Sequence, residues 1–300
     1  MTVLKLGTRG SPLALIQANM VKEALFAAHG IACEIHVIKT TGDRVQDRAL
    51  AEIGGKALWT KELDRALLDG EIDCAVHSMK DVETIRPDAI AIAAMLERAD
   101  VRDRLVGADS LAAIRDGGVV GSSSPRRSAQ VRRARPDLSV VLFRGNVDTR
   151  LAKLAAGEAD ATLLAAAGLA RLGRDEVGVP IAIEEMLPAP AQGAVGIECR
   201  ADDAMTRSLL AAIDHPATSR AVRCERAFLA ALDATCHSPV AALATVDGDL
   251  LHLRGELFSE DGAEHVAGDA TGTDGAALAR DLASALLERA PPAVRAGFGG

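Results

Sequence analysis

The stretch TKELDRALLDGEIDCAVHSMKDV, residues 60–82, joins an amphipathic helical pattern to an apolar run that ends in polar residues. Gly70 is a typical helix stop, and the run at 72–81 has the length of a buried strand. A related stretch, TRLAKLAAGEADATLLAAAGLA, occurs at 149–170, and both copies have Gly-Glu-x-Asp before the strand. The repetition predicts two similar α/β lobes with a cleft between them.

A second pattern also occurs twice, with a strand, a serine cap, a proline and a helix in that order. Ser11 and Pro12 follow the apolar run VLKLG and precede the helical pattern at 12–30. The stretch VVGSSSPRRSAQVRRA, 119–134, repeats this arrangement. Serine is a favoured N-cap and proline a favoured first helical residue. The proline- and glycine-rich stretch 187–200 is typical of a hinge that crosses between lobes.

The remainder of the chain changes character after the helical pattern at 219–233. Alternating residues predict antiparallel strands and a final helix, at 239–246, 250–259, 265–272 and 275–290. This pattern indicates a small α+β domain. Cys236 lies in the short connection at the start of this domain. A thiol in such an exposed loop gains no stabilisation from packing.

Composition is that of an ordinary globular protein, with 300 residues, 49% hydrophobic and 25% charged. The longest apolar runs are shorter than the roughly 18–20 residues that span a bilayer, so we expect no membrane association. The chain enters a strand pattern without a signal-like segment. We therefore expect a cytoplasmic protein.

The five cysteines are an odd number without CxxC spacing, which argues against a disulfide framework and a thiolate zinc site. The seven histidines form no HxxxH or HExxH pair, so no metal is expected. Strand and helix patterns favour packing roles for four cysteines, namely Cys33, Cys74, Cys199 and Cys224. His77 in the apolar run is interpreted as a core histidine.

Five arginines lie between Arg126 and Arg135, although the net charge is −8. Nucleic-acid binding predicts a basic domain and aromatic stacking residues, whereas this chain has 2% aromatic residues and no tyrosine. A small polyanion is therefore the better partner. A solvated helix face remains an equal alternative for Arg132, Arg133 and Arg135.

Ligands of open α/β sheets bind beyond the carboxyl ends of the strands. The residues at these ends are Thr8, Arg9, Ser11, Asp43, Lys80 and Asp81 in the first lobe, and Ser122, Ser123, Ser124, Arg126, Arg127, Arg144, Arg150 and Arg171 in the second. Serine caps and helix N–H groups favour an anion, and arginine forks bind carboxylates. We therefore expect a substrate with several carboxylates. Because a lone acid weakens an anion site, Asp81 is expected to have a chemical task.

These residues lie in motifs that closely resemble the porphobilinogen deaminase (hydroxymethylbilane synthase) family of tetrapyrrole biosynthesis. The matching stretches include TRGSPLAL, GGKALWTKELDRALLDGEIDCAVHSMKDV, GSSSPRR, FRGNVDTRLAKL and PAPAQGAVGIE, in family order from about residue 4 to 240. The resemblance implies lobes like those of periplasmic binding proteins. The expected domains are 1–96 with 193–212, then 97–192, and 215–300 with the cysteine loop. We expect a monomer.

The resemblance also implies the reaction. A dipyrromethane cofactor would be joined to Cys236 by a thioether, and four porphobilinogen molecules would be added head to tail with loss of ammonia. Hydrolysis would then release hydroxymethylbilane. Asp81 would be the catalytic carboxylate. The residues implied to hold the cofactor are Cys236, Lys80, Asp81, Ser124, Arg126, Arg127 and Arg150, and those implied to hold substrate are Arg9, Ser11, Arg144, Arg150 and Arg171.

Several positions depart from the family pattern. Ala234 and Thr235 stand where the family commonly has glycines before the cysteine, and Pro125 stands where an apolar residue is common. Trp59 replaces a usual phenylalanine and is interpreted as either a lid or a core residue. Gly54 and Gly55 suggest a loop that closes over the growing product.

Two other functions use parts of the same pattern. A bilobal small-anion-binding protein without catalysis would share the lobes and the arginines, but it has no need of a loop thiol and normally carries a signal peptide. A ligand-sensing transcription regulator needs a helix-turn-helix module, and the sequence offers no place for one. An intact mass distinguishes these functions, because only the deaminase carries two covalently bound pyrrole units.

Overall fold

The computed structural model describes residues 3–40, 60–235 and 237–298. These residues form two compact units. The first contains the described residues up to 40 together with 60–99 and 193–219, and the second contains 100–192 and 220–298. The sequence predictions for Asp43, Gly54, Gly55, Trp59 and Cys236 lie outside the described residues.

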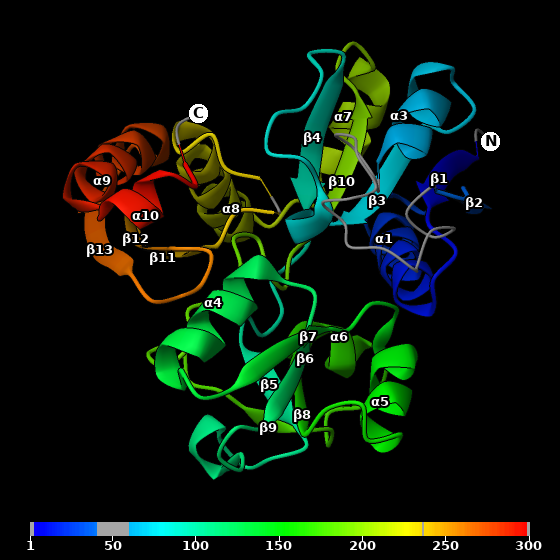
Figure 1. Cartoon of the computed structure of the whole chain (residues 1–300). Helices are drawn as coiled ribbons and strands as arrows, with labels where there is room; N and C mark the ends of the chain where they lie inside the picture. Colours follow the sequence, from blue (N-terminus) through cyan, green and yellow to red (C-terminus); the bar gives the residue numbers. More distant parts are fainter. Residues whose placement is uncertain (1–2, 41–59, 236, 299–300) are drawn as a thin grey trace. The chain divides into compact units, whose positions relative to one another are not determined.

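The first unit is built on a five-stranded sheet (Figure 1). Its strand order is β2 (Cys33–Val37), β1 (Leu4–Thr8), β3 (Cys74–Ser78), β10 (Val195–Arg200) and β4 (Ile90–Met95). β1 runs parallel to β2 and β3, whereas β10 runs antiparallel between β3 and β4. Its helices are α1 (Pro12–His29), α3 (Lys61–Leu68) and α7 (Ala204–Ala211), and a 3-10 turn, η2, spans Met79–Asp81.

The helix starts and stops in this unit follow the sequence signals. Ser11 caps α1 through its side chain, Pro12 is the first helical residue, and Gly30 ends the helix in the left-handed conformation. Gly70 after α3 also has a positive φ of 73°, where a side chain would be strained. The predicted helix at 12–30 is confirmed to within one residue.

The second unit contains a sheet of the same design. Its order is β7 (Ser139–Leu142), β6 (Val119–Ser122), β8 (Ala161–Ala165), β5 (Asp103–Val106) and β9 (Val179–Pro180). Its helices are α4 (Pro125–Ala134), α5 (Val147–Ala155) and α6 (Ala166–Arg171), with a 3-10 turn, η3, at Leu111–Ala113. β6 is parallel to its neighbours β7 and β8, and β5 is antiparallel to β8. The fourth strand is thus antiparallel in both sheets, which confirms the two α/β lobes.

The C-terminal part has an antiparallel sheet, β11 (Val240–Asp247), β12 (Leu250–Phe258) and β13 (His265–Gly272). The accompanying helices are α8 (Pro216–Ala231), α9 (Gly275–Arg289) and α10 (Pro292–Arg295). Phe228, Leu253 and Leu282 belong to its core. A Cβ at Gly255 would lie 2.6 Å from Cζ of Phe228, so glycine permits this packing. The predicted α+β arrangement is confirmed.

This C-terminal part packs against helix α4 and the segment 187–191 within one unit. Glu225 of α8 is fully buried and accepts hydrogen bonds from the backbone N–H groups of Ala191 and Ala244. Ala129 of α4 shares an apolar cluster with Leu243 and Phe258. A buried carboxylate paired with two backbone donors would be costly to separate from them, so these contacts hold the two parts together.

The four described cysteines, Cys33, Cys74, Cys199 and Cys224, are all buried. Burial raises the pKa of each thiol, to about 11 for Cys199 and about 12 for Cys224. Their burial confirms the predicted packing role. A buried, protonated thiol is also a poor nucleophile. Within the described residues, no helix has both the length and the apolar character needed to cross a membrane.

Candidate functional site

In the first lobe, predicted site residues follow two neighbouring parallel strands. Arg9 and Ser11 come after β1, whereas Lys80 and Asp81 form the turn η2 directly after β3. Because β1 and β3 are parallel, their carboxyl ends lie at one edge of the sheet. The structure therefore brings the two pairs to the same edge, as predicted.

The turn that carries Lys80 and Asp81 is fixed to the sheet through its first residue, Met79. The backbone N–H of Met79 donates to the carbonyl of Ala194, with 3.0 Å between N and O, and the Met79 side chain is buried. A Cβ at Gly196 would lie 2.0 Å from Sδ of Met79, so the sheet accepts this side chain only because residue 196 is glycine. Asp81 itself is half-buried at the sheet edge.

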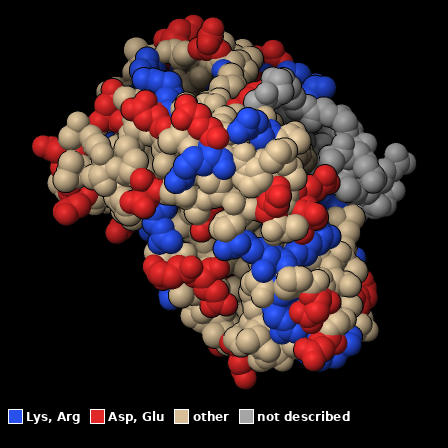
Figure 2. All heavy atoms as spheres, turned by 60° about the vertical axis from the view of Figure 1, so that its left-hand side comes forward, with Lys and Arg blue, Asp and Glu red and all other residues tan. Residues whose placement is uncertain are grey.

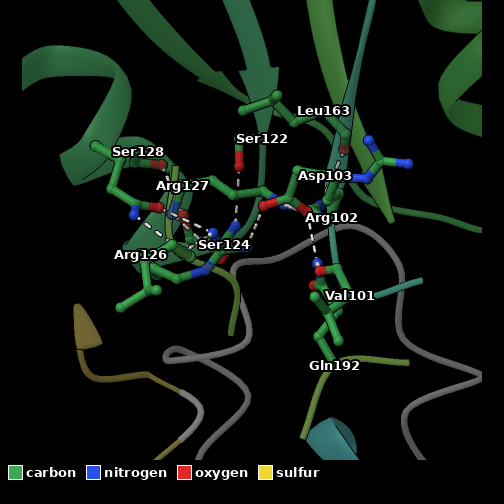
Figure 3. Close-up of polar contacts among 12 residues, drawn as sticks. Val101, Arg102, Asp103, Ser122, Ser124, Arg126, Arg127, Ser128, Leu163 and Gln192 are labelled. Atoms are coloured by element: carbon green, nitrogen blue, oxygen red, sulfur yellow. Dashed lines mark hydrogen bonds and ion pairs between the residues drawn. The ribbon is translucent and has the colours of Figure 1, made fainter. Parts of the chain in front are cut away.

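In the second lobe, Arg126 and Arg127 lie on the first turn of α4, where Ser124 caps the helix. Both side chains are turned inward, with exposed fractions of 3% and 5%. Figure 3 shows them directed toward Asp103, the first residue of β5. Arg126 Nη2 is 2.8 Å from Oδ2 of Asp103, and Arg127 Nη2 is 2.6 Å from Oδ1.

The Nη1 groups of these two arginines also have interior acceptors. Arg126 Nη1 donates to Oε1 of Gln130 and to the carbonyl of Leu187, at 2.8 and 3.0 Å. Arg127 Nη1 donates to the carbonyl of Leu163 at 2.9 Å. Gln192 donates to Oδ1 of Asp103 at 2.9 Å (Figure 3). The pair is therefore oriented by the protein itself.

Asp103 is fully buried, and the sequence analysis did not single it out. Burial alone would raise the pKa of its carboxyl, but the charges of Arg126 and Arg127 outweigh burial and lower it. Burial in turn lowers the pKa of Arg126. Asp103 is the carboxylate that both guanidinium groups contact directly, and the charge of Glu256 on β12 also raises the pKa of Arg126. Nε of Arg126 is buried without a hydrogen-bond partner among the described residues.

The other predicted arginines surround this end of the second sheet. Arg150 of α5 donates from Nη2 to Oγ of Ser123 at 3.1 Å and from Nε to the carbonyl of Gly145 at 3.0 Å. Arg144 is 8% exposed and Arg171, the last residue of α6, is half-buried. Burial lowers the pKa of Arg171. A poorly hydrated guanidinium favours an anionic partner.

The predicted site is thus divided between the two units. Arg9, Ser11, Lys80 and Asp81 belong to the first unit, and Ser124, Arg126, Arg127, Arg144, Arg150 and Arg171 belong to the second. The cysteine loop belongs to the second unit as well, and Cys236 lies outside its described residues.

The residues around Cys236 bear on the departure from the family pattern. Ala234, in place of a glycine, is 2% exposed and packs in the C-terminal core. Its N–H donates to the carbonyl of Leu229 at 2.9 Å. Thr235 donates from its backbone N–H to Oγ of Ser238. The alanine methyl group therefore has an apolar place in the stem of the loop.

Comparison with known proteins identifies the family. Residues 4–208 match the family model described as porphobilinogen deaminase, dipyrromethane cofactor binding domain. The chain belongs to the porphobilinogen deaminase family. Residues 219–290 match the C-terminal domain of porphobilinogen deaminase.

Two curated porphobilinogen deaminases are similar over nearly their whole length. The protein of Sphingopyxis alaskensis is 60% identical, with 97% of this chain and 95% of that protein covered. That of Paracoccus denitrificans is 54% identical, with 96% and 95% covered. Among solved structures, a periplasmic substrate-binding protein of an ABC transporter from Coxiella burnetii aligns with a TM-score of 0.43 at 14% identity, over 72% of this chain and 94% of that one.

Proposed function

We propose that this protein is a hydroxymethylbilane synthase, a transferase that joins four porphobilinogen molecules head to tail with release of ammonia and then frees hydroxymethylbilane by hydrolysis. The observation that carries this proposal is the match of residues 4–208 to the cofactor-binding domain of the porphobilinogen deaminase family. The buried, preoriented arginine pair supports the same conclusion, because the pyrrole substrate carries carboxylates.

The second-lobe residues fit a dipyrromethane cofactor. Arg126 and Arg127 both contact one acid directly, Asp103, and the buried Nε–H of Arg126 can donate a further hydrogen bond. Acetate and propionate groups would be bound by these guanidinium donors through charge-assisted hydrogen bonds. The residues that would hold the cofactor are Cys236 by a thioether, Ser124, Arg126, Arg127 and Arg150 from the second unit, and Lys80 and Asp81 from the first. When bound, the cofactor supplies the terminal pyrrole to which substrate is joined.

Incoming porphobilinogen would be bound through its carboxylates by Arg9, Ser11, Arg144, Arg150 and Arg171. Ser11 contributes at the N-terminus of α1, where backbone N–H groups favour an anion. Arginine forks fix the orientation of a carboxylate as well as its position. This arrangement would hold the ring by its acidic arms and leave its aminomethyl group and nitrogen accessible to Asp81.

Asp81 would act on the ring itself. As the C–N bond of the aminomethyl group breaks and ammonia leaves, positive charge develops on the retained methylene and spreads to the ring nitrogen. A nearby carboxylate stabilises that charge, because the interaction grows as the charge develops. The same carboxylate can accept the proton that the pyrrole carbon loses after coupling. Asp81 is therefore proposed as the catalytic carboxylate, which stabilises the developing charge and acts as a general base.

The thiol that anchors the cofactor is proposed to be Cys236. The other four cysteines are buried with raised pKa values, so they are unsuited to the attachment. A thiol with a pKa near 8.5 is only a few per cent thiolate at neutral pH. This suffices because attachment takes place once in each enzyme molecule.

We also propose the division into domains 1–96 with 193–212, 97–192 and 215–300, which the three separate sheets support. A cytoplasmic monomer that binds no nucleic acid fits the same function. On the face drawn in Figure 2, basic and acidic side chains are interspersed, whereas nucleic-acid-binding proteins gather basic residues on one face.

An intact mass combined with an ammonia assay tests the function. The purified protein should weigh more than its sequence by two pyrrole units, and it should release ammonia from porphobilinogen. A protein of the bare sequence mass that binds porphobilinogen without releasing ammonia would instead be a bilobal anion-binding protein.

A further inference from the structure

A buried group of charges lies behind the turn that carries Lys80 and Asp81. Arg86 has a side-chain exposure of 7%, and its guanidinium contacts three carboxylates. Nε and Nη2 bind Oε1 and Oε2 of Glu198 at 2.8 and 2.9 Å. Nη1 donates to Oε2 of Glu83 at 2.8 Å, and Nη2 also donates to Asp64. All arms of the guanidinium fork are therefore used inside the protein.

The partners of Arg86 come from three different elements. Glu198 is on β10, Asp64 is on α3, and Glu83 follows the turn η2. Oε2 of Glu83 also accepts the hydroxyl of Thr60, which precedes α3, at 2.7 Å. Arg86 therefore joins the segment after η2 to β10, the fourth strand of the sheet, and to helix α3.

Asp81 is consequently anchored on both sides through Glu198. On the N-terminal side, Nε2 of His77 lies 3.2 Å from Oε2 of Glu198. On the C-terminal side, Arg86 forms its bidentate contact with the same carboxylate. Glu198 is fully buried, and the turn between His77 and Arg86 contains the proposed catalytic carboxylate.

The charges in this group sustain one another. Burial would raise the pKa of Glu198, but hydrogen bonds and charge from His77 and Arg86 lower it to about 2. Although burial opposes it, the contacts with Glu198 and Asp64 raise the pKa of Arg86. Only an arginine has the planar fork that serves acceptors in three directions, whereas a lysine is a single point charge. Arg86 thus has a geometric task that charge alone does not fulfil.

We propose that Arg86 is a positioning residue, which places the Lys80–Asp81 turn by binding it to β10 and α3. The inference rests on the proposed function, because it acts through Asp81. A shift of about 1 Å in a reacting group can cost about a hundredfold in rate. Loss of the fork should therefore reduce turnover although Arg86 contacts only protein groups.

The test uses purified holoenzyme with Arg86→Lys, and ammonia release is measured in a single turnover. We expect a rate about 10–100-fold below wild type. The porphobilinogen concentration for half-maximal rate should change less than about threefold, because the arginines proposed to bind its carboxylates remain. A uniform loss of substrate binding without a loss of rate would contradict a positioning role.

Arg200→Lys is the matched control. Arg200 is in the same lobe and binds the carbonyls of Leu67 and Ile72 and the carboxylate of Asp203. It supports α3 and β10, and its polar contacts with described residues all lie outside the segment 77–86. This variant should lower the midpoint of thermal unfolding, yet its rate of ammonia release should stay within about twofold of wild type. A rate loss in Arg200→Lys as large as in Arg86→Lys would reduce Arg86 to a structural role and overturn the proposal.

A double-mutant cycle tests whether Arg86 acts through Asp81. The double variant Asp81→Asn, Arg86→Lys should be no slower than Asp81→Asn alone. Without the Asp81 carboxylate, displacing residue 81 causes no further loss of rate. The inference would be overturned if the double variant lost the product of the two single-variant rate losses. It would also be overturned if the rate of Arg86→Lys lay within twofold of wild type. If Arg86→Lys yields no folded holoenzyme, Glu83→Gln enters the same cycle, with an expected loss of several-fold.

The two proposals fail in different ways. Wild-type protein that carries no cofactor mass and releases no ammonia would overturn the proposed function and the inference together. A fully active Asp81→Asn variant would exclude Asp81 as the catalytic carboxylate, and the positioning role of Arg86 would be excluded with it. If wild type is active and Asp81→Asn is strongly impaired, only the results for Arg86→Lys decide about Arg86.

Discussion

Arg126 and Asp103 form an ion pair inside the second lobe, with Nη2 of the arginine 2.8 Å from Oδ2 of the acid and exposed fractions of 3% and 0%. Asp103 also binds Arg127, so one acid orders two adjacent guanidinium groups before any ligand arrives. A ligand carboxylate then meets donors that have already lost their rotamer freedom. Such preorganisation strengthens binding, because the cost of ordering is met during folding.

Asp103→Asn should strongly destabilise the second unit. The substitution leaves two buried guanidinium groups without their common carboxylate, and breaking a buried pair costs about 3–5 kcal/mol. The measurement is the urea dependence of unfolding at neutral pH. Asp100→Asn is the control, since Asp100 pairs with Arg102 at the surface, where an exposed pair contributes about 0–1 kcal/mol. Equal losses in the two variants would contradict the role of Asp103.

Cys236→Ser should fold normally but carry no covalent pigment and have no activity. A serine hydroxyl is not ionised near neutral pH, and the buried cysteines cannot substitute for the loop thiol. Intact mass and thermal unfolding of the purified variant check both halves of this expectation. A Cys236→Ser protein that still shows the added mass of two pyrrole units would remove Cys236 from the anchoring role.

Arg126→Leu and Arg9→Leu should fail at different stages. Arg126 is buried with Arg127 beside Asp103 and is proposed to hold the permanent carboxylates of the cofactor, so its loss should leave the protein at bare sequence mass. Arg9 is half-buried in the first lobe and is proposed to bind substrate, so Arg9→Leu should carry the cofactor but stall early in elongation. Mass spectra of both variants decide the matter, and the reverse pattern would exchange their roles.

Asp81→Asn should retain the cofactor but turn over extremely slowly. A carboxylate about 4 Å from a developing unit charge, at an effective dielectric near 20, contributes roughly 4 kcal/mol. Each ~1.4 kcal/mol is a factor of ten, so the expected loss is about a thousandfold. Asp81→Glu keeps the charge but displaces it by one methylene, and it should lie between the two. Single-turnover ammonia release from the three holoenzymes provides the measurement. An Asp81→Asn rate within about tenfold of wild type would leave Asp43 as the next candidate.

Acid should weaken the first unit through Glu198. The pKa of its carboxyl is lowered from 4.5 to about 2 in the folded protein, so the unfolded chain binds the proton more readily. The resulting stabilisation, on the order of 3 kcal/mol, is present above pH ~4.5 and is lost as the pH falls toward ~2. Glu198→Gln lacks this titration. Urea midpoints of wild type and variant should therefore converge across this window, and a difference that stays constant from pH 6 to pH 2.5 would contradict the assignment.

The sequence by itself determined the repeated helix and strand patterns of the lobes, their order and the chemistry of the strand ends. Cap and stop residues are local signals, so Ser11, Pro12 and Gly30 defined α1 without knowledge of its surroundings. The repeated helix–Gly-Glu-x-Asp–strand pattern predicted two similar lobes, and both sheets have the same design. Asp81 and the arginines were identifiable because parallel strands always present their carboxyl ends at one edge.

Only the tertiary structure decided how the charges are paired. Asp103 reads in the sequence as one more acid before a short apolar strand, yet β5 lies beside β8, where its carboxylate meets two arginines of α4. Arg86 likewise lies in a polar stretch typical of a loop, and its carboxylates at 64, 83 and 198 come together only when β10 enters the first sheet. Pairing of buried charges depends on contacts between distant segments, and local sequence patterns carry no record of those contacts. Arg86, Arg126 and Arg127 are similarly buried, so the acids in direct contact distinguish them, with three around Arg86 and one shared by Arg126 and Arg127.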